Sequence, residues 1–172
     1  MMFNFAAIIT VLAFVLPIIA NPVPRSNIAR TEWNDNDWNN TEWHEPKTYK
    51  VTVGANGNLR YDPEYVHAKV GDYIKFEFHP KNHTVTESSF NKPCYAIDQG
   101  FSTGFVPVAS EDSWDLPTRK FKVIDEKPHW FYCEQIGHCP AGMVFAVNPP
   151  KEGNTFEKFQ QLAIKTGNDT KW

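Results

Sequence analysis

Short runs of alternating apolar and polar residues follow one another along most of the chain from Thr48 onward. Each run is bounded by Gly, Pro, Asn or Asp, and no helical pattern separates one run from the next. The run at residues 49–53 is the clearest, because YKVTV alternates strictly and then meets the turn-forming GANGN. The other runs that we interpret as strands are residues 70–78, 83–87, 119–125, 129–133 and 143–149. Many short strands of this kind predict an all-β protein, built as a sandwich or a barrel.

The pattern changes after Pro149 and Pro150. Residues 155–165 place their apolar side chains three and four positions apart, which is the period of one helix face. The residues on this face are Phe156, Phe159, Leu162 and Ala163. We therefore expect a short C-terminal helix that lies on the β-domain. No apolar segment follows it, so we expect no lipid anchor of the kind that replaces a hydrophobic tail.

The N-terminal segment predicts export from the cell. Residues 3–20 carry no charge and lead into Asn21 and Pro22, which is typical of a secretory signal peptide cleaved near Ala20. An uncleaved membrane anchor is the alternative, although Pro17 interrupts the apolar run. We expect a mature protein that is secreted, either extracellular or in the cell wall, with no membrane span.

A polar leader follows the signal peptide at residues 21–46, rich in Asn, Asp, Glu and Pro. Its tryptophans recur every five residues, which fits neither a helix face nor a strand face: Trp33, Trp38 and Trp43. We interpret the leader as a disordered arm, the alternative being a docking segment for a wall polymer or a partner. The expected organisation is a signal peptide (1–20), this leader, one β-domain (47–150) and a helical tail (151–172).

Charge and cysteine content narrow the range of functions. The net charge is only −3 and no basic cluster occurs, so neither nucleic acid nor anionic lipid is an expected partner. The chain has three cysteines, an odd number for a secreted protein, so one disulfide leaves one thiol unpaired. That remaining thiol needs a role outside the cell.

The segment FYCEQIGHCPAGM, residues 131–143, suggests what that role is. It combines Cys133, His138 and Met143, and soft thiolate and thioether ligands select copper. Two histidines, one cysteine and a weak axial methionine define the blue-copper electron-transfer site. The loop between a strand ending at Cys133 and a strand beginning at Met143 can direct all three side chains toward one ion.

The directions in which neighbouring side chains point indicate which cysteine is a ligand and which forms the disulfide. In a nearly extended chain neighbours point to opposite sides, so Cys139 faces away from a metal that His138 faces. Cys139 is then the expected disulfide partner of Cys94, and Cys133 is the thiolate ligand.

A second imidazole must come from another strand, and His83 is the best candidate. It opens the run 83–87 and shares a face with Val85, which we expect to point inward. His129 lies four residues from Cys133 along an extended strand, about 13 Å away, which is too far to share an ion. Three histidines are set aside because they lie in the leader, in a polar turn or on a strand face expected to point to solvent: His44, His67 and His79.

These segments resemble a known family. NHTVTES, the cysteine at position 94, and FYCEQIGHCPAGM followed by VFAVNPP resemble cupredoxins of the phytocyanin type, especially the secreted fungal cupredoxin-like proteins. The resemblance covers residues 47–150, and the spacing C-x4-H-x4-M with a Cys directly after the His is specific to that branch. It implies a Greek-key β-sandwich, a disulfide and one copper ion, with these residues: Cys94 and Cys139 for the disulfide; His83, Cys133, His138 and Met143 for copper.

The function implied is one-electron transfer by a type 1 copper protein that is not an enzyme, because a closed four-ligand shell leaves no open position for water. The alternative is an extracellular copper-binding or cell-wall-associated protein without redox turnover. We expect a monomer whose partner is a redox donor or acceptor, either a small molecule or a wall component.

Three sequons are candidate sites of N-glycosylation. Asn39 and Asn168 lie in the two tails and are the stronger candidates. Asn82 is weaker, because a glycan there would crowd its neighbour His83. If Asn82 is unmodified, we expect its side chain to form a hydrogen bond across to the Cys133 loop.

Overall fold

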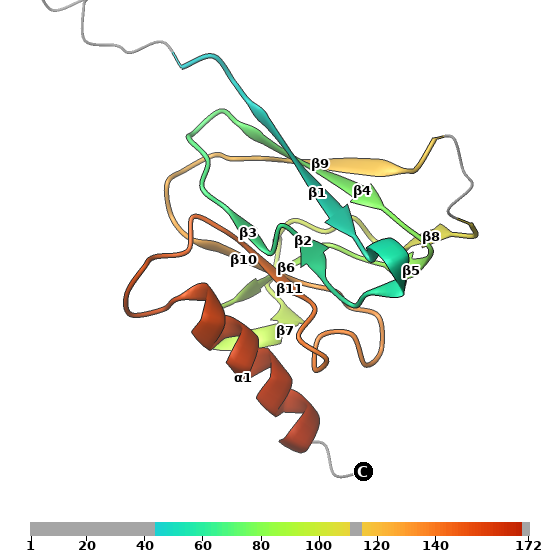
Figure 1. Cartoon of the computed structure of the whole chain (residues 1–172). Coiled ribbons are helices and arrows are strands. Elements are labelled where there is room, and N and C mark those ends of the chain that lie inside the picture. The colour runs from blue at the N-terminus through green and yellow to red at the C-terminus, as the bar shows by residue number, and fades with distance from the viewer. Residues whose placement is uncertain (1–43, 111–114, 170–172) are drawn as a thin grey trace, which may run out of the picture. The chain divides into compact units, whose positions relative to one another are not determined.

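The computed structural model describes residues 44–110 and 115–169, which form a β-sandwich with one helix packed on it (Figure 1). The predicted signal peptide, the leader up to Trp43 and the sequon at Asn39 lie outside the described residues. No helix in the described part of the chain is both long and apolar enough to span a membrane.

One layer of the sandwich is a four-stranded sheet in the order β2-β1-β4-β9. Its strands are β1 (Thr48–Val53), β2 (Tyr61–Asp62), β4 (Tyr73–Phe78) and β9 (Thr118–Lys122), and the single turn η2 (Ala55–Gly57) follows β1. β1 runs parallel to β4, whereas the other pairs are antiparallel. Along β4 every second residue is buried, so Ile74, Phe76 and Phe78 face the second layer.

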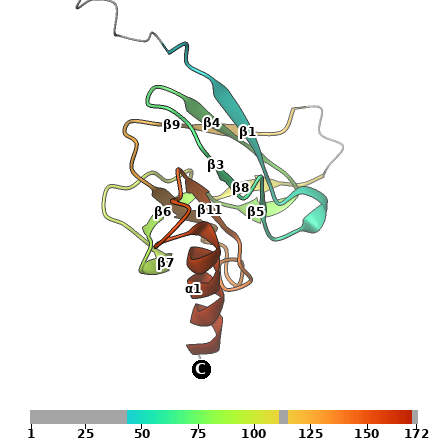
Figure 2. The same cartoon turned by 60° about the vertical axis from the view of Figure 1, so that its left-hand side comes forward.

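The second layer is a five-stranded sheet in the order β3-β11-β10-β6-β7. Its strands are β3 (Tyr65–Val66), β6 (Thr86–Ser89), β7 (Lys92–Ala96), β10 (His129–Tyr132) and β11 (Val144–Val147). A separate ribbon pairs β5 (Lys81–His83) with β8 (Val106–Val108). Several pairs of neighbouring strands, such as β1 with β4 and β6 with β10, come from distant parts of the chain (Figure 2), as in a Greek key and unlike a series of hairpins.

Aromatic rings fill the space between the two layers. Phe76 of the first sheet contacts Phe131 and Phe145 of the second, with ring centroids 6.4 and 5.3 Å apart. The opposite face of β10 and β11 is covered by the helix α1 (Phe156–Asp169), where the Phe159 ring lies 4.7 Å from that of Trp130. Both faces of these strands are therefore buried, which accounts for the unbroken apolar sequence of β11.

The predicted sandwich and C-terminal helix are confirmed, with α1 continuing to Asp169 and with Leu162 only half-buried. The prediction of one strand at residues 83–87 is wrong, because β5 ends at His83 and β6 begins at Thr86. Between them, the backbone N–H groups of Thr84 and Val85 bind the Cys133 sulfur and the Thr103 hydroxyl instead of a neighbouring strand. The short strands β2, β3, β5, β7 and β8 were not predicted from the sequence.

A buried carboxylate ties the start of β1 to the turn before β4. Asp72 is inaccessible to solvent and accepts hydrogen bonds from the backbone N–H groups of Lys47 and Lys69, at 2.7 and 2.9 Å. The His44 imidazole lies 2.6 Å from the same carboxylate. Burial by itself raises the pKa of Asp72, but these hydrogen bonds outweigh it and hold the pKa below the ordinary 3.8.

Replacement of Asp72 by Asn should destabilise the fold. Asp72→Asn turns one acceptor into an NH₂ group that faces an N–H donor, so we expect the free energy of unfolding at neutral pH to fall by about 2 kcal/mol. Because the pKa of Asp72 is lower in the folded state, its stabilising effect is present at neutral pH and is lost as the pH falls through that lowered value. Urea unfolding at neutral and acid pH measures both effects. Asp98→Asn removes an exposed carboxylate and serves as the control, and equal losses in the two variants would contradict the assignment.

Candidate metal centre

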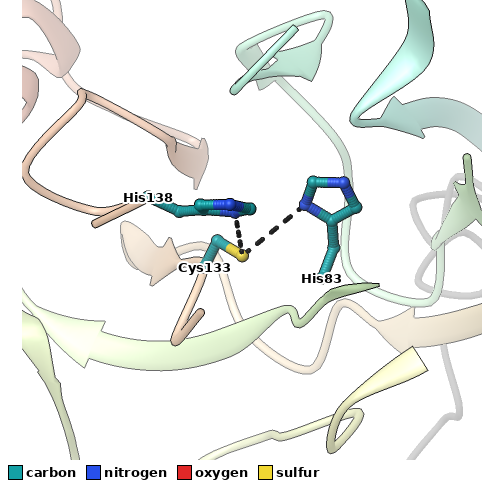
Figure 3. Close-up of side chains that lie close together, drawn as sticks. All are labelled: His83, Cys133 and His138. Carbon is teal, nitrogen blue, oxygen red and sulfur yellow. Dashed lines mark hydrogen bonds between the residues drawn. The ribbon is translucent and has the colours of Figure 1, made fainter. Parts of the chain in front are cut away.

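Three side chains from separate parts of the chain point toward one another (Figure 3). His83 is the last residue of β5, Cys133 directly follows β10, and His138 lies in the loop from β10 to β11. The Cys133 sulfur lies 3.4 Å from Nδ1 of His138 and 3.8 Å from Nδ1 of His83. One potential ligand atom from each residue lies within 4.8 Å of the other two, which is close enough for a single ion.

Met143 is held beside these residues by the backbone. Its N–H donates to the His138 carbonyl at 3.0 Å, and its carbonyl accepts from the Cys133 N–H at 3.1 Å. The side chain is fully buried in the same core cluster as Cys133. The residues expected to hold copper are thus placed together by one tight loop and by the end of β5.

Burial makes the site asymmetric. Cys133 and His83 are 0 % and 1 % exposed, whereas His138 is half-buried. The thiol and one imidazole are therefore enclosed by protein, and the His138 side is the side from which the group can be approached.

The two imidazoles are suited to binding a cation. Burial lowers the pKa of His83, and the neighbouring His138 lowers it further. The pKa of His138 is also lowered by burial, with a smaller effect from Lys81. Both rings are consequently neutral at neutral pH and keep a free lone pair for a metal.

Burial also raises the pKa of the Cys133 thiol, although backbone N–H groups of Thr84 and Gln135 oppose this effect. Without a metal the thiol is protonated at neutral pH, and a bound cation would take the place of that proton. A buried set of two imidazole nitrogens and one thiolate, with a thioether nearby, fits copper and does not fit Mg²⁺ or Ca²⁺, which prefer oxygen.

Thr84 supports the sulfur in a way that the sequence analysis missed. Its N–H points to the Cys133 sulfur at 3.4 Å, and its buried hydroxyl accepts from the Glu134 N–H at 2.8 Å. The expectation that Asn82 would make the bond to this loop is wrong. The Asn82 Oδ1 is buried and has no hydrogen-bond partner among the described residues. The sequence feature that could have indicated Thr84 is its position directly after His83.

Gly54 was also missed, although it lies in the GANGN turn. Its backbone has φ +77°, and a Cβ added there would lie only 2.2 Å from Nε2 of His83. The His83 ring therefore packs directly on the backbone of this turn, in space that any other residue would occupy.

The remaining histidines are used elsewhere. His129 lies between Glu87 and Asp125, at 2.8 and 3.2 Å from their carboxylates. The expectation that His79 faces solvent is wrong, because its side chain is only 13 % exposed and lies 3.3 Å from the Glu77 carboxylate. The other two lie beside Asp72 (His44) and beside the Tyr65 ring (His67).

The predicted disulfide is confirmed. Cys94 of β7 and Cys139 are bonded with their Cα atoms 5.8 Å apart, and Cys133 is free and buried. The bond attaches the residue next to His138 to the edge strand of the second sheet.

Comparison with known proteins finds two fungal relatives, both from Arthroderma benhamiae. The chain is 33% identical over 122 residues to a probable GPI-anchored cupredoxin-1, covering 71% of this chain and 62% of the relative. It is 32% identical over 117 residues to an extracellular serine-rich protein, covering 68% of this chain and 45% of that relative. The chain therefore spans less than two thirds of the length of either one.

No family model matches the chain. Among solved structures, a purple cupredoxin from Nitrosopumilus maritimus aligns with a TM-score of 0.44 and 16% identity, over 58% of this chain and 96% of that one. The sheet order, the grouping of His83, Cys133 and His138, and the likeness to the fungal cupredoxin together place the chain in the cupredoxin superfamily.

Proposed function

We propose that this chain is a blue copper protein that transfers single electrons. The observation that carries the proposal is the buried Cys133 thiol, which lies within 4 Å of Nδ1 of both His83 and His138. Met143 is held next to the same loop by its backbone and would contribute a weak thioether ligand. Copper, when bound, supplies the Cu(II)/Cu(I) couple.

The chain's own residues give this couple a fixed environment. Cys133, as the thiolate, balances positive charge, and the Thr84 N–H stabilises the negative sulfur. Gly54 leaves room for the His83 ring on one side of the site. Side chains held in place by packing need little rearrangement when the charge of the ion changes, which favours electron transfer over chemistry that needs an open position.

Electrons enter and leave on the His138 side in this proposal. His138 is half-buried, and Ile136, two residues before it in the same loop, is 92 % exposed. The partly exposed imidazole is where a small molecule or a wall component would donate or accept the electron.

The names of the relatives support a place outside the cell. One is described as a GPI-anchored cupredoxin and the other as an extracellular protein. Export, a monomeric state, and glycosylation at Asn39, Asn168 or Asn82 belong to the same proposal.

Removal of the thiol tests the proposal most directly. The oxidised, copper-loaded protein should be intensely blue or blue-green and should lose its colour on reduction, because thiolate-to-Cu(II) charge transfer gives rise to the colour. Cys133→Ser should abolish the colour in the visible spectrum even if the imidazoles still hold copper. His67→Ala changes an exposed imidazole and is the control. A colourless wild-type copper complex, or a blue protein that does not exchange electrons with an added reductant and oxidant, would contradict electron transfer.

Substitution of Met143 should change the reduction potential without removing the metal. Met143→Gln should retain copper and colour but lower the reduction potential, because a harder oxygen donor favours Cu(II) over Cu(I). Redox titration followed at the visible band measures the change. An unchanged potential would assign Met143 to the core alone.

Two glycines in one turn provide a matched pair for His83. Gly54→Ala places a methyl group against the His83 ring, whereas a Cβ at Gly57, also at positive φ (+71°), meets nothing within 4 Å. Both substitutions should cost about 1 kcal/mol of backbone strain, but only Gly54→Ala should weaken copper binding and alter the visible spectrum. Thermal melting and copper titration of both variants separate the two effects. Equal copper affinity in the pair would show that the space at Gly54 does not set the position of His83.

A further inference from the structure

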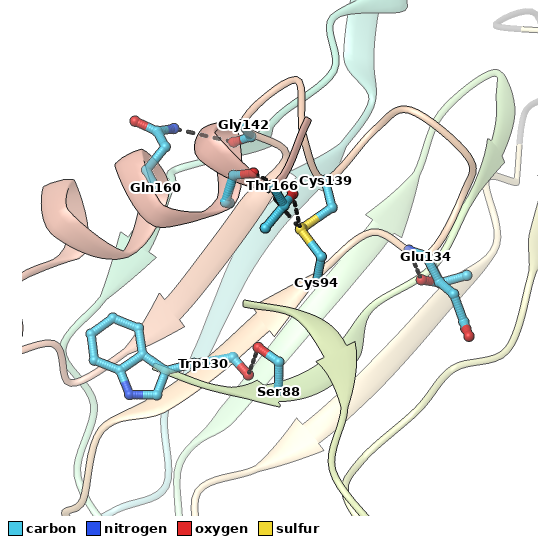
Figure 4. The surroundings of a disulfide bond; sticks show 10 residues. Ser88, Cys94, Trp130, Glu134, Cys139, Gly142, Gln160 and Thr166 are labelled. Atoms are coloured by element: carbon cyan, nitrogen blue, oxygen red, sulfur yellow. Dashed lines mark hydrogen bonds between the residues drawn. A yellow bond between two sulfur atoms is a disulfide. The ribbon is translucent and has the colours of Figure 1, made fainter. Parts of the chain in front are cut away.

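The loop that separates His138 from Met143 is covered on its outer side by α1 (Figure 4). The side-chain Nε2 of Gln160 on this helix donates to the Gly142 carbonyl at 3.2 Å and to the Glu64 carboxylate at 2.9 Å. Both partners are acceptors, so the two hydrogens of one amide NH₂ group serve one acceptor each. Gln160 therefore bridges the loop to the segment before β3.

Helix and loop also approach each other closely. A Cβ on Gly167 would lie 2.8 Å from the Cβ of Pro140, and a Cβ on Gly142 would lie 3.4 Å from the Cδ1 of Ile164. In addition, the Thr166 hydroxyl lies 3.3 Å from the Cys94 sulfur of the disulfide. The loop is thus bonded to β7 through the disulfide and packed against α1, which also contacts the disulfide.

The bond to Gly142 acts on the part of the loop that sets the spacing of the two ligands. The Gly142 N–H donates to the Cys139 carbonyl at 2.8 Å, and the Met143 N–H donates to the His138 carbonyl at 3.0 Å. Gly142 has φ +92°, a conformation in which glycine is otherwise free to move to other regions. Fixing its carbonyl from outside restricts that freedom.

We propose that Gln160 is a positioning residue of the metal centre, which holds the Gly142 carbonyl and thereby fixes His138 relative to Met143. The inference rests on the proposed copper site, but the restraint on the loop is a property of the metal-free chain as well. α1 is then part of the site's architecture in addition to covering the sheet.

The test removes the donor and keeps the helix. Gln160→Met has a side chain of similar length and a similar helix propensity but no donor, and Gln160→Glu removes the donor without adding an apolar group. Gln160→Lys supplies a donor to both acceptors and should restore the behaviour of the wild type. Gln161→Met changes the exposed neighbouring residue and is the matched control.

Two measurements are made on the full chain. In the metal-free protein, hydrogen exchange of the Gly142 and Met143 amides should be roughly fivefold faster in Gln160→Met and Gln160→Glu, the factor that corresponds to one typical hydrogen bond. In the copper-loaded protein, loss of copper to a chelator should accelerate by a similar factor and the visible spectrum should shift. Gln160→Lys and Gln161→Met should match the wild type in both measurements.

The outcomes separate this proposal from the proposed function. Unchanged amide exchange in both donor-free variants would overturn the role of Gln160, whatever the metal. Faster exchange with unchanged copper release and spectrum in a blue protein would also overturn it, because the restraint would not reach the ligands. Faster exchange in a chain whose wild type forms no coloured copper complex would support the restraint on the loop and reject the copper function.

Discussion

The register of β10 against β11 is the constraint on which the rest of the structure depends. Phe131 pairs with Phe145 and Tyr132 with Val144, so the loop between them starts at Cys133 and ends at Met143. Side chains alternate across a strand, and this register places Cys133 and Met143 in the interior cluster that contains Phe131 and Phe145. A slip of one residue would exchange the two faces and direct the donors toward α1.

Cover on both faces makes this register stable. One set of alternating side chains from β10 and β11 packs in the sandwich interior, and the other set packs against α1. Trp130 and Phe159 are in contact on the α1 side. Neither face of β10 or β11 can turn to solvent without exposing large apolar side chains, which is the main energetic cost in a domain of this size. The Cys94–Cys139 disulfide and the Gln160 hydrogen bonds extend the same cover to the loop itself.

The enclosed site combines neutral imidazoles with a thiol that is protonated in the metal-free protein. Burial is the first cause of each shift: it lowers the pKa of His83 and His138 and raises that of Cys133. Burial makes the charged thiolate of Cys133 unfavourable, and a bound cation would offset that cost. The fold and the metal therefore favour the same arrangement of side chains. Because His138 is the one candidate ligand that is partly exposed, the site can be reached from solvent only at this residue.

Features with a local cause were predictable from the sequence. Alternation over several residues identified β1, β4 and β9, short apolar runs identified β10 and β11, and helical spacing identified α1. The spacing of Cys133, His138 and Met143 identified the candidate site. Tertiary structure alone decided what depends on residues far apart in the chain. The run 83–87 is broken because Thr84 bonds to Cys133, 49 positions away. Gly54 matters because the His83 ring packs against it. Asp72 matters because it accepts a hydrogen bond from the backbone N–H of Lys47. Short strands such as β5 and β8 carry too few residues to show a period, and only their pairing across the fold defines them.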